Sequence, residues 1–307
     1  MERFIDEMKL QNIKFHYISE NDAVQIMKTE YSASKLMAYA PLFDKYRATE
    51  KQGQYIDLDF AYLYDLASLD SQLRKLVICM CLDIEQMLKT RLIADASCID
   101  SKGVVKEFVQ ENTIFFNTVY SPENMDHVFK RMTRDTTIEE LSVSDFLEVI
   151  QFGTIQRFVR FFYDQFAPDL YGKAYAPFER YLDSVRRIRN SSAHNNGLIS
   201  ELLNRQYKEE AFEKNTLVLS FLGKNGVRHR TLDTNMSKQA VHDLCCLIHM
   251  YVHFLPKELA KNTLEELRKF LQVTCRNNSA YYIKNPALIS AHSYLSNVTD
   301  VYITYIS

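Results

Sequence analysis

The chain has 307 residues, of which 47% are apolar and 25% charged, and its formal net charge is −2. This balance is typical of a soluble globular protein with one large domain or two ordinary ones. It excludes a generally basic nucleic-acid binder, so any nucleic-acid binding must use a local basic patch. Glycine (7 residues) and proline (6) are both scarce. Because a chain this poor in turn-forming residues cannot build many hairpins, we expect mostly long helices.

The N-terminus and the cysteines indicate a cytoplasmic protein. The first ten residues, MERFIDEMKL, lack the apolar core of a signal peptide. The six cysteines form no CxxC pair or regular framework, which favours reduced, mostly buried thiols. The longest apolar runs, such as LVICMCL at 76–82, are far shorter than the roughly 20 residues that a membrane span needs.

The first third of the chain contains two predicted helical regions separated by a polar loop. Apolar residues recur at helical spacing over 20–45, and Ser19 begins an S-x-x-D capping box before them. Residues 47–56 are mostly polar and predict a loop. Residues 57–97 have apolar side chains every three or four positions, which predicts a helix with one buried face. Because about 40 residues exceed a typical globular helix, we expect one break near 67–70.

The rest of the chain alternates further predicted helices with one different segment. Helical patterns cover residues 143–166, with a turn or close-packing point at Gly153, and then residues 177–195, 237–256 and 257–273. Residues 215–233 contain LVLSFL, GKNG and VRHRTL in succession, which predicts a β-hairpin. From Arg276 onward the chain is polar and rich in tyrosine, and its pattern leaves its order open.

A dense polar cluster, RIRNSSAHNN at 187–196, contains Arg189, Asn190 and His194. On a helix Asn190 and His194 share a face, and the long Arg189 side chain, about 140° around the axis, reaches toward the same cleft. Histidine exchanges protons near neutral pH, arginine grips a phosphate by a bidentate fork, and asparagine orients the ring or a ribose. This combination suits phosphodiester chemistry. A polar helix end is the alternative, since the NNG at 195–197 is a good C-terminal stop signal.

A second cluster has the donor types of a zinc site. Cys245, His249 and His253 are spaced four residues apart, with His242 one turn earlier. These residues lie in a strongly apolar predicted helix without an evident fourth ligand. A packed stripe of small and aromatic side chains is therefore the favoured interpretation.

Two charged clusters each allow two interpretations. Glu85 and Lys89 have the spacing of an ordinary helical ion pair, but Glu85 could instead point inward and hold an arginine of the 186–189 group. At the tip of the predicted hairpin stand three cations that either contact phosphates or belong to a solvated turn: Lys224, Arg228 and Arg230. Motifs of the types GxxxxGK[ST], GxGxxG, HExxH and GxSxG are absent from the sequence.

Several segments, taken together in order and spacing, resemble one family. They are YIDLDFAYLYDLASLDSQLRKLVICMCLDIEQMLKTRL (55–92), VIQFGTIQRFVRFF (149–162) and VRRIRNSSAHNNGL (185–198), with a weaker fit in YSASKLMAYAPLFDKY (31–46), which departs from the usual glycine-tyrosine pattern. Within the first segment, family pairs are matched by Asp59-Phe60, Leu69-Asp70, Leu73-Arg74, Ile84-Glu85 and Lys89-Thr90. Over roughly residues 20–260 the chain resembles the Abi-like proteins of bacteria, an abortive-infection family that acts against bacteriophage.

This resemblance implies an RNA-cleaving activity. Abi-like proteins look like members of the HEPN superfamily, whose all-helical ribonucleases carry R-x(4–6)-H, often as R-N-x-x-x-H. The stretch from Arg189 to His194 fits that form in full. The implied reaction needs no metal or other cofactor: the ribose 2′-hydroxyl attacks the adjacent phosphate and leaves a 2′,3′-cyclic phosphate and a 5′-hydroxyl. His194 would move protons, and Arg189 would stabilise the phosphorane. Asn190 would support one of these two residues in its role. Supporting residues would be Glu85, Arg186 and Arg187, the last of which also has an allowed spacing to His194.

The resemblance also implies an organisation. We expect an all-α, HEPN-like helical bundle with an N-terminal helical extension and one small β-hairpin at 216–232. Residues 1–55 would form the N-terminal segment packed on the core, residues 56–275 the HEPN-like domain and residues 276–307 a C-terminal tail. HEPN centres usually face each other in pairs and this chain carries one motif, so we expect a homodimer. Four arginines within 180–189 would then double into a basic cleft.

These features predict a growth-arresting toxin of bacterial phage defence that cleaves RNA. RNA is the expected substrate, a small noncoding RNA is a further expected partner, and neither DNA nor membrane is expected. The alternative is a catalytically inactive HEPN-fold protein that binds RNA or serves as a scaffold. A nucleotide-transferase role lacks support because the sequence contains no nucleotidyltransferase motif.

Overall fold

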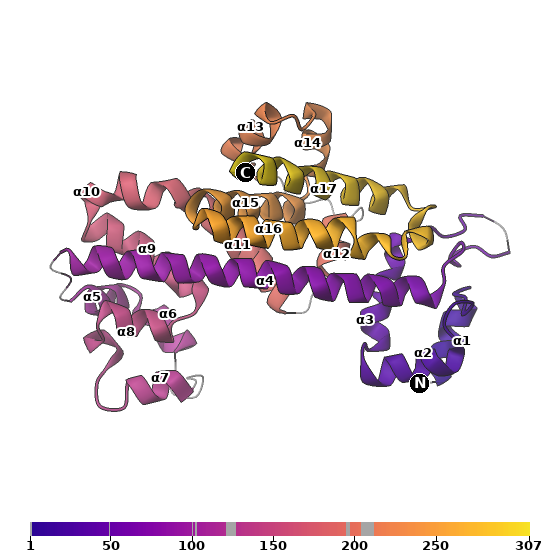
Figure 1. Ribbon diagram of the computed structural model, residues 1–307. Coiled ribbons are helices and arrows are strands. Elements are labelled where there is room, and N and C mark those ends of the chain that lie inside the picture. The colour runs from indigo at the N-terminus through magenta and orange to yellow at the C-terminus, as the bar shows by residue number, and fades with distance from the viewer. Residues whose placement is uncertain are drawn as a thin grey trace. The chain divides into compact units, whose positions relative to one another are not determined.

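The computed structural model describes residues 2–48, 50–99, 101, 103–120, 127–194, 197–203 and 212–307. Every regular element in these ranges is a helix, apart from two isolated backbone bridges, Lys14 with Asp59 and Lys45 with Tyr55. The expected all-α fold is therefore confirmed (Figure 1). The chain forms two compact units, one of residues 1–80 with 187–307 and the other of residues 81–186.

The larger unit contains both ends of the chain. Its elements are α1 (Glu2–Leu10), α2 (Glu20–Thr29), α3 (Ala33–Met37), η1 (Ala40–Leu42), the first part of α4 (Phe60–Ser97), the last part of α11 (Ala176–Ala193), α12 (Leu198–Leu203), α13 (Thr216–Lys224), α14 (His229–Asn235), α15 (Gln239–Phe254), α16 (Lys257–Gln272), η4 (Thr274–Arg276), η5 (Ser279–Tyr282) and α17 (Pro286–Ile306). The smaller unit contains the remainder of α4 and α11 with α5 (Val104–Glu111), α6 (Thr113–Val119), α7 (His127–Met132), η2 (Ile138–Glu140), α8 (Val143–Val149), α9 (Phe152–Gln165), α10 (Pro168–Leu170) and the π-helical turn η3 (Tyr171–Tyr175).

The N-terminal helices pack on the first two turns of α4. The predicted cap is present, because the Ser19 hydroxyl accepts the backbone N–H of Asp22 at 3.2 Å, at the start of α2. The helical pattern over 20–45 forms α2, α3 and η1 rather than one helix. Apolar side chains of these helices form one buried cluster with those of α4, including Met8, Leu36 and Phe60.

Helix α4 runs without interruption for 38 residues, so the expected break near 67–70 is wrong. The helix contains neither glycine nor proline. Ala67 and Asp70 are completely buried. The Asp70 carboxylate accepts hydrogen bonds from Arg74, Lys35 and the backbone of Ile199. Its side chain therefore does not compete for the helix backbone, which is the usual reason that aspartate weakens a helix.

The predicted β-hairpin at 216–232 is also wrong, because this segment forms α13, a short turn and the start of α14. The side-chain oxygen of Asn215 caps α13 by accepting the N–H groups of Leu217 (3.1 Å) and Val218 (3.3 Å). Val218 and Leu222 are fully buried and stand one helical turn apart. The apolar run therefore has a helical period. Gly223 lies within α13, and Gly226 serves the turn with a φ of +94°.

Near Gly153 the chain breaks between α8 and α9, as expected, and the non-helical residues are 150 and 151. A Cβ at Gly153 would lie 3.8 Å from the Arg186 side chain, so this glycine is also a close-packing point. The segment from Arg276, whose order the sequence left open, ends in the 21-residue helix α17. Figure 1 shows α17 beside α16. No helix of the described ranges combines the length and hydropathy that crossing a membrane requires.

Candidate active site

The Arg-Asn-x-x-x-His motif occupies the C-terminal end of α11. Arg189 and Asn190 lie four and three residues before the last residue of α11, Ala193, and are partly exposed, whereas His194 follows the helix and is exposed. The backbone N–H of His194 donates to the Asn190 carbonyl at 3.0 Å. This helical hydrogen bond extends the α11 geometry to His194, so the two residues share a face as predicted. The rest of the expected asparagine-rich cap, residues 195 and 196, lies outside the described ranges.

Arg189 is available to bind an anion. Its Nη1 donates to the Asn190 side-chain oxygen at 3.4 Å, a long contact with a neutral group. It makes no ion pair with any residue that the structure describes. A partly exposed guanidinium without a carboxylate partner keeps its fork of N–H donors for a ligand such as a phosphate.

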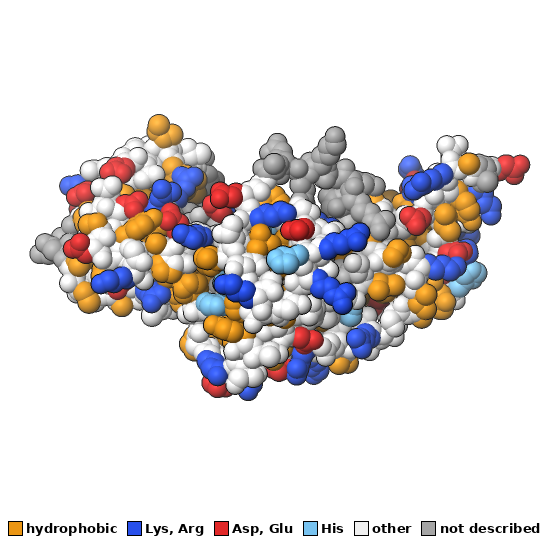
Figure 2. Space-filling model, turned by 90° about the horizontal axis from the view of Figure 1, so that it is seen from above, with side chains coloured by type: hydrophobic (Ala, Val, Ile, Leu, Met, Phe, Trp, Pro, Cys, Tyr) orange, Lys and Arg blue, Asp and Glu red, His pale blue; other side chains and the backbone are white. Residues whose placement is uncertain are grey.

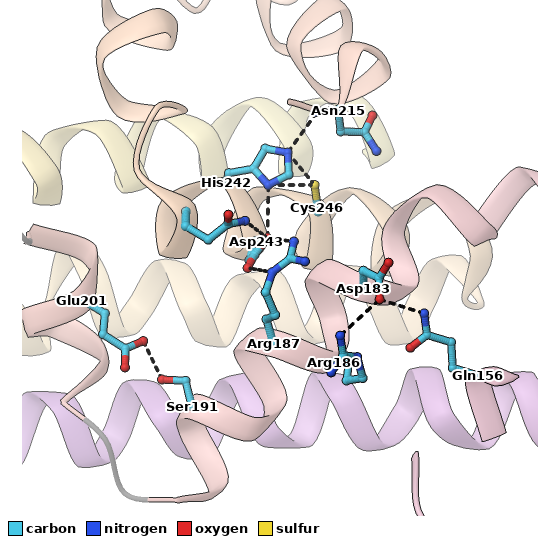
Figure 3. Close-up of polar contacts among 11 residues, drawn as sticks. Gln156, Asp183, Arg186, Arg187, Ser191, Glu201, Asn215, His242, Asp243 and Cys246 are labelled. Carbon is cyan, nitrogen blue, oxygen red and sulfur yellow. Dashed lines mark hydrogen bonds and ion pairs between the residues drawn. The ribbon is translucent and has the colours of Figure 1, made fainter. Parts of the chain in front are cut away.

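Arg187, in contrast, is bound to a buried carboxylate. Its Nε and Nη2 atoms donate to the two Asp243 oxygens at 2.7 and 2.8 Å (Figure 3). Asp243 on α15 is only 3% exposed at its side chain. This fork-to-fork pair ties α11 to α15 two residues before Arg189. Arg187 is thereby engaged within the protein, and of the two arginines with an allowed spacing, Arg189 is the better candidate for phosphate contact.

The Arg187–Asp243 pair extends to His242. The backbone N–H of Asn215 donates to His242 Nε2 at 2.9 Å, so Nδ1 carries the ring proton and donates to Asp243 at 3.1 Å. Gln239 adds a further hydrogen bond to Asp243 at 3.0 Å. This network was not predicted from the sequence. The one signal in the sequence was Asp243, which stands within the apolar stretch of α15. A buried aspartate needs polar partners.

A second buried carboxylate, Asp70 on α4, fixes the chain on both sides of His194. Its oxygens accept Arg74 Nε at 2.9 Å and the Ile199 backbone N–H at 2.8 Å. Arg74 Nη1 also donates to the carbonyl of Ser192 at 3.3 Å. The end of α11 and the start of α12 are thus both attached to α4. Asp70 and Arg74 are two of the positions that carry the family resemblance.

Asp70 lies in a buried region in which the pKa values of two neighbouring side chains are shifted. The Lys35 ammonium lies 3.4 Å from Asp70, yet burial, helped by the nearby Arg74 charge, lowers the pKa of Lys35 below its usual value. Burial first, and then the charge of Asp70, raises the pKa of the Tyr39 phenol. The Asp70 contacts are therefore made in a low-dielectric environment, where they hold the motif more firmly than surface contacts would.

Glu201 on α12 is a further acid beside the motif. It accepts a hydrogen bond from the Ser191 hydroxyl at 2.6 Å. Burial raises the pKa of Glu201, and the negative charges of Asp70 and Asp243 add to this effect. Ser191, Glu201 and Asp243 all line a pocket of about 260 Å³ next to Arg187.

A larger pocket of about 990 Å³, lined by both polar and apolar side chains, includes Gly197, which is three residues after His194. Its lining includes Gly197 and Ser200, several aromatic side chains and four charged residues, Asp44, Lys45, Arg47 and Glu201. Lys45 Nζ lies 4.3 Å from the ring centre of Tyr55. Because a three-residue stretch spans at most about 11 Å even when extended, this pocket begins within that distance of the His194 backbone.

The remaining predicted supporting residues lie in the smaller unit. Glu85 Oε1 pairs with Lys89 Nζ at 3.4 Å, and both side chains are mostly buried, so the predicted helical pair is present. Arg186 Nη2 lies 3.4 Å from Asp183, which also accepts a hydrogen bond from Gln156 at 3.0 Å (Figure 3). These contacts give Glu85 and Arg186 local partners.

The three predicted RNA-contacting cations are exposed, but they do not stand on a hairpin tip. Lys224 ends α13, Arg228 precedes α14 and Arg230 lies in its first turn. On the face shown in Figure 2, Lys and Arg side chains are dispersed among acidic, apolar and histidine side chains rather than joined in one strip. A basic surface on that face would therefore be local.

The cysteine–histidine stripe is packed into α15. His249 Nδ1 lies 2.9 Å from the Tyr302 hydroxyl, the His249 and His253 rings stack at 4.0 Å, and Cys245 is fully buried. Burial lowers the pKa of His249 to about 3. Within the described residues, no group of three or more His, Cys, Asp or Glu side chains is arranged to hold a metal ion.

The family model of the Abi-like proteins matches residues 29–200. The chain belongs to the Abi-like protein family. The match covers more than half of the chain and is narrower than the expected range of 20–260. It includes Asp70, Arg74 and the whole motif, and it ends in α12, so α13 to α17 lie outside it. No curated protein and no solved structure matches the chain.

Proposed function

We propose that this Abi-like protein is a metal-independent endoribonuclease that arrests growth during phage infection. One observation carries the proposal: Arg189 and His194 are both accessible at one helix end, with a guanidinium that pairs with no described carboxylate, while buried groups hold the helix end on either side. An accessible guanidinium and an accessible imidazole at one firmly held helix end are what phosphodiester cleavage needs.

The chemistry follows from the groups at this end of α11. His194 accepts the proton of a ribose 2′-hydroxyl, and the resulting oxygen attacks the adjacent phosphorus. Arg189 stabilises the negative charge that develops on the phosphorane oxygens. The protonated His194 then returns this proton to the leaving 5′-oxygen as the P–O5′ bond breaks, so the products are a 2′,3′-cyclic phosphate and a 5′-hydroxyl. Asn190, which contacts Arg189, orients the guanidinium or the ribose.

Further residues are proposed to hold the RNA. Lys45, Arg47 and neighbouring aromatic side chains of the 990 Å³ pocket offer positive charge and stacking surfaces for RNA. Lys224, Arg228 and Arg230 offer a second set of phosphate contacts. A symmetric dimer would bring two motifs together and double the arginines within 180–189. A small noncoding RNA is the proposed regulator.

The proposal is tested with His194→Ala, Arg189→Ala and a matched control, His16→Ala, which replaces another exposed histidine. Each protein is induced in bacteria and growth is scored. Each purified protein is then incubated with total RNA in EDTA, and the cleaved ends are mapped. Wild type and His16→Ala should arrest growth and leave cyclic-phosphate ends, and the two motif variants should lose at least about a hundredfold in cleavage.

The other outcome supports a different function. If His194→Ala and wild type behave alike in both assays, the motif is a helix end and the endoribonuclease proposal is wrong. RNA binding that persists in both proteins without cleavage would then support an inactive RNA-binding or scaffold protein.

A further inference from the structure

An apolar pocket of about 330 Å³ lies within the larger unit, between α4, α12, α16 and α17. Its walls are formed mainly by large aliphatic and aromatic side chains, among them Leu69, Leu73, Leu202, Phe270, Leu288 and Leu295. This volume is at the lower end of the range for small-molecule sites, which are likewise mostly apolar with a few polar groups. An empty apolar cavity lowers stability in proportion to its volume, so an occupant would stabilise the fold.

The mouth of the pocket carries a positive charge. Arg276 and Ile289 line the pocket and are also exposed, so they mark where it meets solvent. Arg276 makes no ion pair with a described residue, and no acidic side chain is among the lining residues that the structure describes. Burial raises the pKa of the Cys275 thiol to about 12, so this lining group is neutral at physiological pH. The ring of His292 is engaged by the Leu271 carbonyl at 2.7 Å.

We propose that this pocket binds a single-chain amphiphilic carboxylate of the medium-chain fatty acid class. The leucine-rich wall suits an unbranched alkyl chain, and a volume of about 330 Å³, at the small end for ligand sites, suits one chain rather than a two-chain lipid. The Arg276 guanidinium at the mouth suits the carboxylate, because its two parallel N–H groups match two carboxylate oxygens.

The pocket shares a wall with the elements that hold the candidate active site. Ile199 and Leu202 of α12 line it. The Ile199 N–H is the group that Asp70 holds, and Glu201 on the same helix accepts the Ser191 hydrogen bond. An alkyl chain that contacts Ile199 and Leu202 therefore stabilises α12 in the position in which it lines the pocket. The binding itself does not depend on RNA cleavage.

The chain contains no tryptophan, so one introduced at the pocket mouth is a unique fluorescent reporter. Ile289 is 46% exposed there, and Ile289→Trp is the reporter variant of the full-length protein. Hexanoate, octanoate, decanoate and dodecanoate are titrated below their micelle concentrations. Saturable binding should tighten by about fourfold per added methylene and then level off once the pocket is full. Decanoate should also raise the melting temperature of the wild-type protein.

Two substitutions and a matched control separate this site from non-specific binding. Arg276→Ala should weaken decanoate at least about tenfold and leave decanol unchanged, whereas Arg268→Ala, an exposed arginine on α16 outside the pocket lining, should change neither. Ala291→Phe fills the pocket and should abolish binding of both ligands while cooperative unfolding is retained.

The inference is overturned if no chain length binds saturably, if affinity rises without levelling off, or if decanoate and decanol respond equally to Arg276→Ala. Because Arg276 is exposed, its replacement leaves the core intact, and the result stands even if Ala291→Phe does not fold. RNA cleavage by the same preparations is measured separately, so loss of one proposal is not mistaken for loss of the other.

Discussion

Arg187 and Arg189 lie two residues apart on α11, and their surroundings assign them different tasks. Arg187 forks onto the buried Asp243, so its charge is neutralised within the protein. Arg189 contacts only a side-chain amide among the described residues. A sequence motif that allows four to six intervening residues cannot choose between them, but the position of an internal carboxylate can.

Replacement of Arg187 should therefore lower stability, whereas replacement of Arg189 should abolish cleavage with little effect on stability. Arg187→Ala leaves Asp243 buried with fewer donors, so we expect the free energy of unfolding to fall by about 1–3 kcal/mol. Arg189→Ala removes no internal pair, so unfolding should change by less than about 0.5 kcal/mol while cleavage is lost. Urea denaturation and the RNA assay, run on both variants, check this. Equal destabilisation by the two substitutions would contradict the assignment.

At the level of elements, the first turn of the short helix α12 is attached to both α4 and α11. Asp70 holds the Ile199 backbone, and Glu201 holds Ser191 on α11. The raised pKa of Glu201 means that its carboxylate form is disfavoured in the folded state. This group therefore contributes stability below its ordinary pKa of 4.5 and loses that contribution as pH rises through its folded pKa.

Glu201→Gln keeps the acceptor for Ser191 and removes the titration. We expect the variant to be more stable than wild type at pH 8, with the difference shrinking toward pH 4, where the wild-type side chain becomes protonated. Urea midpoints of both proteins at several pH values measure this. All other titrating groups are common to both proteins, so the two curves differ by Glu201 alone. Parallel curves would mean that Glu201 titrates normally.

Helix positions were the most predictable feature of the sequence, and the errors have physical causes. Periodic apolar residues correctly indicated α4, α9, α15 and α16. The hairpin at 216–232 was wrong because an apolar run of six residues fits either a strand or a helix, and the Asn215 cap decides for the helix. The break in α4 was wrong because Asp70 finds partners far away in sequence, at Lys35 and Ile199.

The candidate site was predictable in part for the same reason. Arg189, Asn190 and His194 are neighbours in sequence, so their spacing alone placed them on one helix end, as the structure shows. The groups that support them, Asp70 and Asp243, are separated from the motif by about 120 and 50 residues. No local pattern connects such residues, because only the packing of α4 and α15 brings them together. Their roles could be found only in the structure.

At the level of the whole molecule, the single motif leads to the proposed symmetric dimer, in which both chains contribute to cleavage. Purified protein should then have a solution mass of twice the 36.0 kDa of one chain. Wild type is mixed and re-equilibrated with an equal amount of His194→Ala. Because random pairing leaves about a quarter of the dimers with two intact motifs, cleavage should fall to about one half of that of the wild type alone at the same amount.

A matched control and a clear alternative make this mixing experiment decisive. Mixing with His16→Ala should double cleavage, since both partners then carry an intact motif. If each chain works alone, mixing with His194→Ala should leave the activity contributed by the wild-type chains unchanged. Co-expression should follow the same rule, with excess His194→Ala relieving the growth arrest only when active dimers need two motifs. A monomeric mass together with unchanged activity would contradict the dimer, and cleavage by wild type alone would still support the endoribonuclease.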